Sequence, residues 1–323
     1  MPNPRPYPQA LQSGAPSTRL GVVYFQLLCA MMFFGLSFVF TSLALTELRP
    51  VSIIVARLVI SLAAMALLSR IPAVTRIVGG LQRPARSDFR VFVLVAFFQP
   101  FLYFLSENTG LLFAGPAVAA IIVATIPVVT PFFAFLLLRE HITPLVILSA
   151  FVSLAGVALI VYAGGEAGGA HPLGVLLIFG AVLAAVGYAI ALRNMPAHYS
   201  SFTVVFWQNL IGLGLFLPVF LVLDLGATVA AGVPSRSVLG ALVFLGVFPS
   251  TLSFIFLGRG IRVLGAVKAN ITTNTVPVFA ALFSVLVLGE ELSLIMLLGM
   301  AIVISGVLLS QHRGRSVRGY SVK

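Results

Sequence analysis

Charged residues are scarce in this chain of 323 residues: Asp, Glu, Lys and Arg make up 8% of it, whereas 60% of its residues are hydrophobic. A soluble domain carries about 25% charged residues. No soluble fold has enough interior to hide this much apolar surface. The apolar residues instead recur in stretches of about 20, the length that a helix needs to cross the hydrocarbon core of a bilayer. The composition therefore predicts an all-α integral membrane protein.

Cysteine is almost absent, and the familiar catalytic motifs are missing. The single cysteine, Cys29, excludes an intrachain disulfide and a cysteine-based zinc site. The sequence has no His-Glu-x-x-His zinc motif, no phosphate-binding P-loop and no Gly-x-Ser-x-Gly nucleophile turn. We therefore expect neither enzymatic activity nor a metal or other cofactor. The net charge of +11 does not indicate nucleic-acid binding, because Lys and Arg lie in short gaps between the apolar runs.

Apolar runs bounded by proline, glycine or charged residues predict ten transmembrane helices. The predicted spans are 20–44, 51–69, 90–113, 116–138, 144–163, 173–192, 203–223, 238–257, 264–288 and 292–310.

The distribution of Lys and Arg predicts the orientation of these spans. With both termini in the cytoplasm, fifteen basic residues fall on the cytoplasmic side, and only Arg49 and Arg236 fall outside. This bias is the one that positive-inside topology requires. We expect residues 1–19 to form a disordered cytoplasmic tail and residues 312–323 to form a basic cytoplasmic tail.

An internal repeat divides the remaining chain into two halves. A shift of 150 residues aligns 110–161 with 260–311 without a gap and gives fifteen identities in 52 positions. Residues 20–165 and 172–311 then form two repeats of five helices each. Because five is odd, the second repeat must enter the membrane inverted, which is a common plan of secondary transporters.

Several short motifs resemble the EamA-type branch of the drug/metabolite transporter superfamily. The motifs are Phe34-Gly35, Arg57, Pro127, Leu138-Arg139-Glu140 and Gly156-Val157, repeated in the second half as Pro277, Leu288-Gly289-Glu290 and Gly306-Val307. The family's Gly-Glu-Arg motif departs here to Arg139-Glu140-His141 and Gly289-Glu290-Glu291.

The resemblance implies ten helices around a central cavity and export of small metabolites, amino acids among them. We expect a secondary transporter of the bacterial inner membrane that works by alternating access. A passive or gated pore for small solutes and a drug-efflux protein remain alternatives. The expected partners are a small-molecule substrate and membrane lipid, with a homodimer left open and nucleic acid excluded.

Two charges inside predicted spans are candidate substrate ligands. Arg57 and Glu107 both lie about 10 Å below the outer surface, at a rise of 1.5 Å per residue. The pair could be a structural salt bridge, or it could recognise an anionic group and titrate during transport, with Asn108 beside it. Arg57 corresponds roughly, through the repeat, to a second polar group formed by Trp207, Gln208 and Asn209.

The ninth span carries the densest polar stretch of any span. Asn270 and Asn274 are four residues apart and share one helical face. With Thr273 they are candidates for the lining of a substrate cavity, although hydrogen bonding between helices would also explain them. Lys268 is the weakest candidate ligand, because its side chain can reach the membrane surface.

Two further pairs occupy equivalent positions in the halves. Pro127 and Pro277 lie within spans and are candidate hinges or kinks. Glu140 and Glu290 lie at helix ends, where a carboxylate can complement the dipole of the following helix, so we expect them to be structural.

Overall fold

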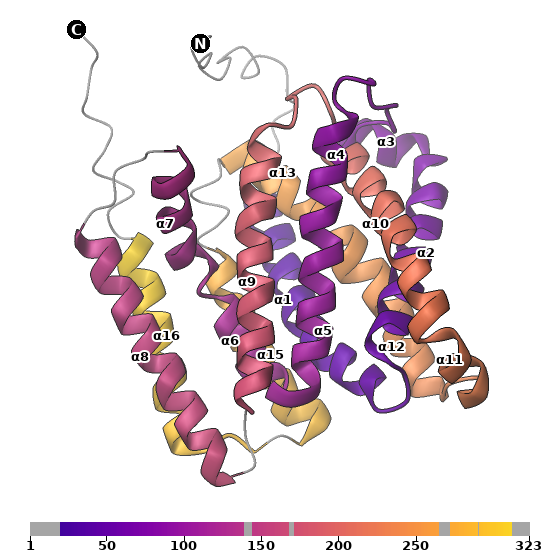
Figure 1. Cartoon of the computed structure of the whole chain (residues 1–323). Helices are drawn as coiled ribbons and strands as arrows, with labels where there is room; N and C mark the ends of the chain where they lie inside the picture. The colour runs from indigo at the N-terminus through magenta and orange to yellow at the C-terminus, as the bar shows by residue number, and fades with distance from the viewer. Residues whose placement is uncertain (1–19, 139–143, 168–170, 265–271, 290, 312–323) are drawn as a thin grey trace, which may run out of the picture.

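The computed structural model describes residues 20–138, 144–167, 171–264, 272–289 and 291–311, and these residues form helices without any strand (Figure 1). The first half contains α1 (Leu20–Leu45), α2 (Pro50–Ser69), α3 (Pro72–Val78), α4 (Phe89–Ala96), η2 (Phe97–Leu102), α5 (Tyr103–Ala114), α6 (Pro116–Val123), α7 (Ile126–Leu138) and α8 (Pro144–Ala167). The second half contains α9 (Pro172–Arg193), α10 (Ser201–Leu223), α11 (Leu225–Ala231), α12 (Arg236–Val247), η3 (Phe248–Ser253), α13 (Phe254–Leu264), η4 (Thr273–Thr275), α15 (Val276–Phe283), η5 (Ser284–Leu288) and α16 (Leu294–Gln311).

Six helical stretches of the described residues are long and apolar enough to cross a membrane. Four shorter apolar helical stretches accompany them, at Pro116–Thr130, Ile147–Leu159, Val276–Leu288 and Leu294–Leu309. They fall within α6 and α7, α8, α15 and η5, and α16, respectively. The outer surface of these helices is apolar: Phe151 and Leu154 of α8 and Leu294 and Leu298 of α16 are all more than half exposed. The chain is therefore an all-helical, multi-pass membrane protein.

The element order repeats between the halves. The short helices α3 and α11 follow α2 and α10, and each ends at a glycine with positive φ, Gly79 (85°) and Gly232 (74°). The π-helical segments η2 and η3 interrupt equivalent long helices, and each contains a proline, Pro100 in η2 and Pro249 in η3. Figure 1 shows α3 and α11 at opposite ends of the bundle.

Equivalent threonines repeat the same local hydrogen bond. Thr125 donates its hydroxyl proton to the carbonyl oxygen of Ile122 (2.6 Å), and Thr275 donates to that of Thr272 (2.7 Å). Each threonine precedes a helix whose second residue is proline, Pro127 in α7 and Pro277 in α15. At that position a proline removes no helical hydrogen bond.

The halves pack against each other through reciprocal contacts. Gly110 of α5 lies against Ile178 of α9, and the equivalent Gly260 of α13 lies against Leu27 of α1. In the same way α4 contacts α10 while α12 contacts α2, and α7 contacts α9 while α15 contacts α1. The two repeats therefore interlock rather than forming two separate units.

Several boundaries differ from the sequence-based expectation. The sequence did not predict α3 and α11, which at seven residues each are too short to be recognised as membrane spans. The expected span 90–113 is a helix kinked at Gln99, whose backbone is non-helical (φ −145°, ψ 118°) and which precedes Pro100. A proline within a helix removes a main-chain hydrogen bond, which accounts for the kink.

Candidate functional site

Arg57 lies in α2, about two turns from its first residue, and only 2% of its side chain is exposed. Its Nε donates a hydrogen bond to the hydroxyl of Ser250 in η3 (3.0 Å). Its guanidinium carbon lies 4.1 Å from the centroid of the Phe104 ring, in a cation–π contact. Nη1 is buried and has no hydrogen-bond partner. The side chain is thus held in place by one hydrogen bond and one ring, and part of its donor capacity is unused.

Ser250 belongs to a polar junction between α2, α10 and η3, which we define as Arg57, Ser61, Asn209, Ser250 and Thr251. Ser61 and Thr251 share a hydrogen bond between their hydroxyls (2.7 Å). Asn209 donates to the hydroxyl of Ser61 (3.0 Å) and to the carbonyl oxygen of Ser250 (3.4 Å). All five side chains are at most 3% exposed.

The π-helical geometry of η3 explains why this junction forms. A π-helical turn shifts the main-chain hydrogen-bond pattern and is often found at functional sites. Here the carbonyl oxygen of Ser250 accepts from Ser61 (3.3 Å) as well as from Asn209. The hydroxyl of Thr251 donates to the carbonyl oxygen of Gly246 (3.0 Å). Polar side chains from three elements therefore meet at a break in the helix.

Glu107 and Asn108 lie in α5 and are 5% and 0% exposed. Glu107 Oε1 accepts a hydrogen bond from the hydroxyl of Tyr103, one turn earlier (3.0 Å). Both the oxygen and the nitrogen of the Asn108 amide are buried without a hydrogen-bond partner. Asn108 is therefore a polar side chain at full burial with its hydrogen-bonding capacity unused.

The expected ion pair between Arg57 and Glu107 is not formed. Both residues are described, and no nitrogen of Arg57 lies within 4.0 Å of a Glu107 oxygen. Each charge contacts a different aromatic side chain instead: Glu107 is hydrogen-bonded to Tyr103, and Arg57 lies over the ring of Phe104. The centroids of these two rings lie 5.6 Å apart, in an edge-to-face arrangement.

The second predicted polar group is split between two environments. Asn209 belongs to the polar junction, whereas the indole nitrogen of Trp207 donates to the carbonyl oxygen of Gln82 (2.9 Å). Gln208 is 1% exposed, and its side-chain oxygen has no hydrogen-bond partner. It shares a helical face with Gly212, one turn away, which lies against Pro100 of η2.

Trp207 is part of a hydrogen-bonded network at the end of the bundle where α3 lies. The side chain of Gln82 accepts from the main-chain nitrogen of Ser200 (2.9 Å) and donates to the carbonyl oxygen of His198 (3.1 Å). Tyr199 accepts from the main-chain nitrogen of Ala85 (2.9 Å) and donates to Asp88 (2.8 Å). We call these contacts between loop 79–88 and the start of α10 the Gln82 network.

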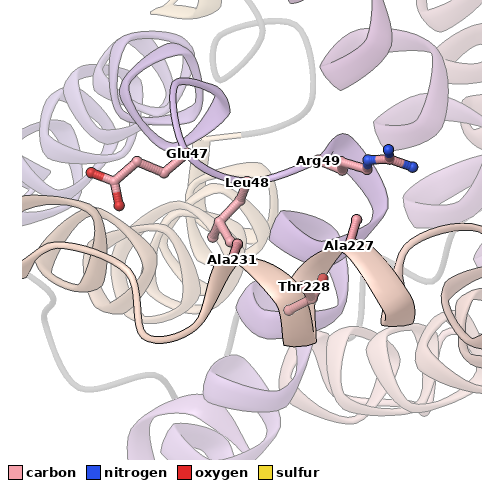
Figure 2. A pocket seen from close by; sticks show the side chains of 6 residues that line it. All are labelled: Glu47, Leu48, Arg49, Ala227, Thr228 and Ala231. Carbon is pink, nitrogen blue, oxygen red and sulfur yellow. The ribbon is translucent and has the colours of Figure 1, made fainter.

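At the opposite end, Asp224 joins α10 to α2 by accepting hydrogen bonds from Ser52. A shallow pocket of about 110 Å³ lies beside this contact, between the α1–α2 turn and α11 (Figure 2). Its lining residues are Glu47, Leu48, Arg49, Ala227, Thr228 and Ala231. In Figure 2 the charged ends of Glu47 and Arg49 point away from each other. No residue of the polar junction lines this pocket.

Some predicted site residues remain untested. Lys268, Asn270, Glu140 and Glu290 lie outside the described residues. Thr273 and Asn274 lie in the 3₁₀ turn η4, directly before α15. Their assignment to a cavity stays a prediction.

Sequence reasoning missed Ser61, Ser250 and Thr251. The signal that could have found the last two was the run Pro249-Ser250-Thr251-Leu252-Ser253, which places three hydroxyl groups beside a proline inside an apolar span. Ser61 is a single serine on an apolar helix, and a serine there can satisfy itself on its own main chain. No pattern distinguished it.

Comparison with known proteins agrees with this architecture. The family model of the EamA-like transporter family matches residues 21–162 and again 172–311. The chain therefore belongs to the EamA-like transporter family, and it contains two copies of the family's repeat.

The individual relatives have low sequence identity to this chain. The chain is 28% identical over 280 residues to the uncharacterized transporter YcxC of Bacillus subtilis (strain 168), covering 84% of this chain and 87% of that protein. It is 25% identical over 234 residues to a probable terminal-alkyne amino-acid exporter of Streptantibioticus cattleyicolor, covering 72% and 77%. One solved crystal structure superposes with a TM-score of 0.58 at 19% identity, covering 88% of this chain and 98% of that one, which shows a shared fold.

Proposed function

We propose that this protein is a secondary transporter that exports small metabolites, such as amino acids, across the bacterial inner membrane by alternating access. The observation that carries the proposal is the polar junction, a buried set of hydrogen-bonding side chains inside an apolar bundle, where α2 of one repeat meets α10 and η3 of the other. Polar and charged groups are costly inside a membrane and commonly mark a substrate or ion pathway.

The proposed topology has ten spans. The six long apolar stretches would supply six spans, and the four shorter apolar helices would supply the others. The opposite placement of α3 and α11 supports inverted repeats, and the excess of arginine around α3 supports a cytoplasmic location for that end. Both termini would then be cytoplasmic, Asn270 and Asn274 would face the cavity, and Pro127 and Pro277 would be sites of bending.

The amino-acid component of the proposal draws on one relative, whose name describes an amino-acid exporter. Alternating access needs two closures that open in turn. The Gln82 network and the Asp224 contact with Ser52 are suited to this task, because each joins the two repeats at one end of the bundle. We propose no chemical conversion of the cargo.

Reconstitution into proteoliposomes tests the function. We expect uptake of a labelled amino acid against its concentration gradient when a proton or sodium gradient is imposed, and counterflow when vesicles are preloaded with unlabelled substrate. Equilibration without accumulation under every gradient would instead support a pore or facilitator. Uptake of cationic dyes but no metabolites would support drug efflux.

Cysteine labelling in a Cys29→Ser background tests the topology. A cysteine placed at Ala231, the last residue of α11, should react with an impermeant maleimide added outside intact cells. A cysteine placed at Arg83 should react only after the membrane is permeabilised. The reverse pattern would invert the proposed orientation.

A further inference from the structure

The strongest unexplained feature of the interior is a set of buried polar atoms with no hydrogen-bond partner on three helices that pack together. Nη1 of Arg57 lies on α2, the amide of Asn108 on α5 and the side-chain oxygen of Gln208 on α10, and α2 contacts both α5 and α10. Nearly all buried polar atoms in native proteins are hydrogen-bonded, so each exception calls for an explanation. A missing ligand that brings its own donors and acceptors would explain all three.

The arginine indicates the chemistry of that ligand. Nε is the one Arg57 nitrogen that donates a hydrogen bond among the described residues, and it is held by Ser250, while Phe104 fixes the plane of the guanidinium. The Nη1 edge is left free in a fixed orientation. A planar guanidinium edge matches the two oxygens of a carboxylate, with which it forms strong, paired hydrogen bonds.

The surrounding charges restrict the ligand further. Glu107 is buried on α5, about one turn from Phe104, whose ring Arg57 contacts, and it is hydrogen-bonded to the neighbouring Tyr103. Together the two side chains carry no net charge when both are ionised. A simple anion would leave an uncompensated negative charge inside the membrane, which is costly. A ligand with a carboxylate and an ammonium group would leave the site neutral.

Resting on the proposed function, we infer that Arg57 binds the carboxylate of a zwitterionic cargo and that Glu107 binds its ammonium group. The unpaired arrangement of the two side chains is what leaves each charge available to the cargo. Ser250 and Tyr103 act as positioning residues, because each holds one of the charged groups in place. Asn108 and Gln208, on two helices that α2 contacts, supply unused donors and acceptors for the remainder of the cargo.

A binding assay on the purified full-length protein tests this inference without requiring transport. The probes are the standard amino acids, their carboxamides, their decarboxylated amines and the matching acids that lack the amino group. Binding is measured as the rise in Tm in detergent. We expect at least one amino acid to raise Tm in a saturable way, and we expect its three analogues to raise it much less.

Variants assign the two charges. Arg57→Gln should weaken binding of the amino acid by about tenfold to a hundredfold, as expected for loss of a charged hydrogen-bonded pair, while the carboxamide becomes as good a ligand as the acid. Glu107→Gln should remove discrimination against the acid without the amino group. Arg57→Lys keeps the charge and Ser250→Ala keeps the arginine, so both should bind with intermediate affinity. If Arg57→Gln does not fold, Arg57→Lys and Ser250→Ala test the role of Arg57 in its place.

Ser153→Ala is the matched control, because Ser153 is a buried hydroxyl without a hydrogen-bond partner that lies on α8, away from the junction. It should bind like the wild type. The inference would be overturned if Arg57→Lys, Ser250→Ala and Arg57→Gln all bound the amino acid as well as the wild type does. It would also be overturned if only amines or amides, or none of the probes, raised the Tm. If the protein transports solutes that are not zwitterionic, this inference fails but the proposed function stands. If it binds amino acids as expected but transports none, only the proposed function is refuted.

Discussion

Asp224, the residue that follows α10, accepts two hydrogen bonds from Ser52 in the first turn of α2, one from its main-chain nitrogen (3.0 Å) and one from its hydroxyl (3.1 Å). The carboxylate is 5% exposed. It satisfies a free N–H group at the start of a helix that belongs to the other repeat. A capping interaction, ordinarily local, here joins two parts of the chain 172 residues apart.

We predict that Asp224→Ala lowers the free energy of unfolding by about 1 to 2 kcal/mol, the usual cost of losing a helix cap and its charge at the N-terminus. Thermal unfolding in detergent measures the loss. Thr46→Ala is the control, because the exposed Thr46 hydroxyl bonds only to the nearby carbonyl oxygen of Leu43. Equal Tm values for the two variants would show that the Ser52 contact contributes nothing.

Glu47 gives a prediction about pH. Its side chain accepts a hydrogen bond from the main-chain nitrogen of Ser235 (2.8 Å), and interactions with Ser235 lower the pKa of Glu47 below its ordinary value of 4.5. A carboxyl group with a lowered pKa stabilises the folded state above its unfolded pKa and loses this effect as the pH falls through the folded value.

Wild type should therefore have a higher Tm than Glu47→Gln at neutral pH, by a small amount because the group is exposed. The difference should disappear as the pH falls below 4.5. A series of Tm measurements on both proteins between neutral and acidic pH checks this, and a difference that is constant across the series would contradict it.

Close packing between α8 and α16 depends on glycine. A Cβ added to Gly156 would lie 2.7 Å from the carbonyl oxygen of Gly299 and 2.8 Å from the main-chain nitrogen of Val303. Small residues allow this close approach of membrane helices. Gly156→Ala should thus destabilise the protein by about 1 to 3 kcal/mol, as overpacking generally does.

Gly240→Ala provides the comparison, since a Cβ at Gly240 of α12 would meet no atom within 4 Å. Its Tm should stay level or rise, because alanine favours a helix over glycine. The measurement is the Tm of both variants in the same detergent. Similar losses in both would indicate that helix propensity, and not the contact with α16, sets the effect.

Gln82 supports a prediction about local opening. Replacing it by alanine removes the acceptor of the Ser200 N–H and the donor to the His198 carbonyl. Hydrogen–deuterium exchange should then quicken in peptides covering 79–88 and 196–203, and remain unchanged in α8. Arg83→Ala, next to Gln82 and exposed, should show wild-type exchange. Unchanged exchange in Gln82→Ala would mean that the other contacts of the Gln82 network are enough to hold loop 79–88 against the start of α10.

Much of the fold could be predicted because the bilayer imposes one length and one composition on every span. The repeat was also visible, since identities such as Thr125 with Thr275 and Gly110 with Gly260 preserve the same contacts in both halves. The kink at Gln99 could be located only through Pro100, and the direction of a kinked helix depends on neighbours that a sequence does not show.

The site was harder to predict because pairing depends on rotation and on distant partners. The sequence placed Arg57 and Glu107 at matched depths, yet Arg57 bonds to Ser250, 193 residues away, and Glu107 bonds to Tyr103, four residues away. Opposite charges suggested a pair, whereas each charge contacts a different aromatic side chain, Phe104 or Tyr103. Sequence identified which residues are unusual in a membrane but not which of them touch.

The two ends of the bundle differ in what would loosen them. At the end with α3, the Gln82 contacts to Ser200, His198 and Trp207 join neutral groups, and Asp88, which accepts from Tyr199, is the one carboxylate of the Gln82 network. At the far end Glu47 and Asp224 hold Ser235 and Ser52, so both of these contacts depend on a carboxylate. Acid and high salt act on charges and leave amide contacts largely untouched. The composition of the surrounding medium can therefore weaken the contacts at the far end more than those at the end with α3, and the balance between the two ends becomes a property of the environment as well as of the sequence.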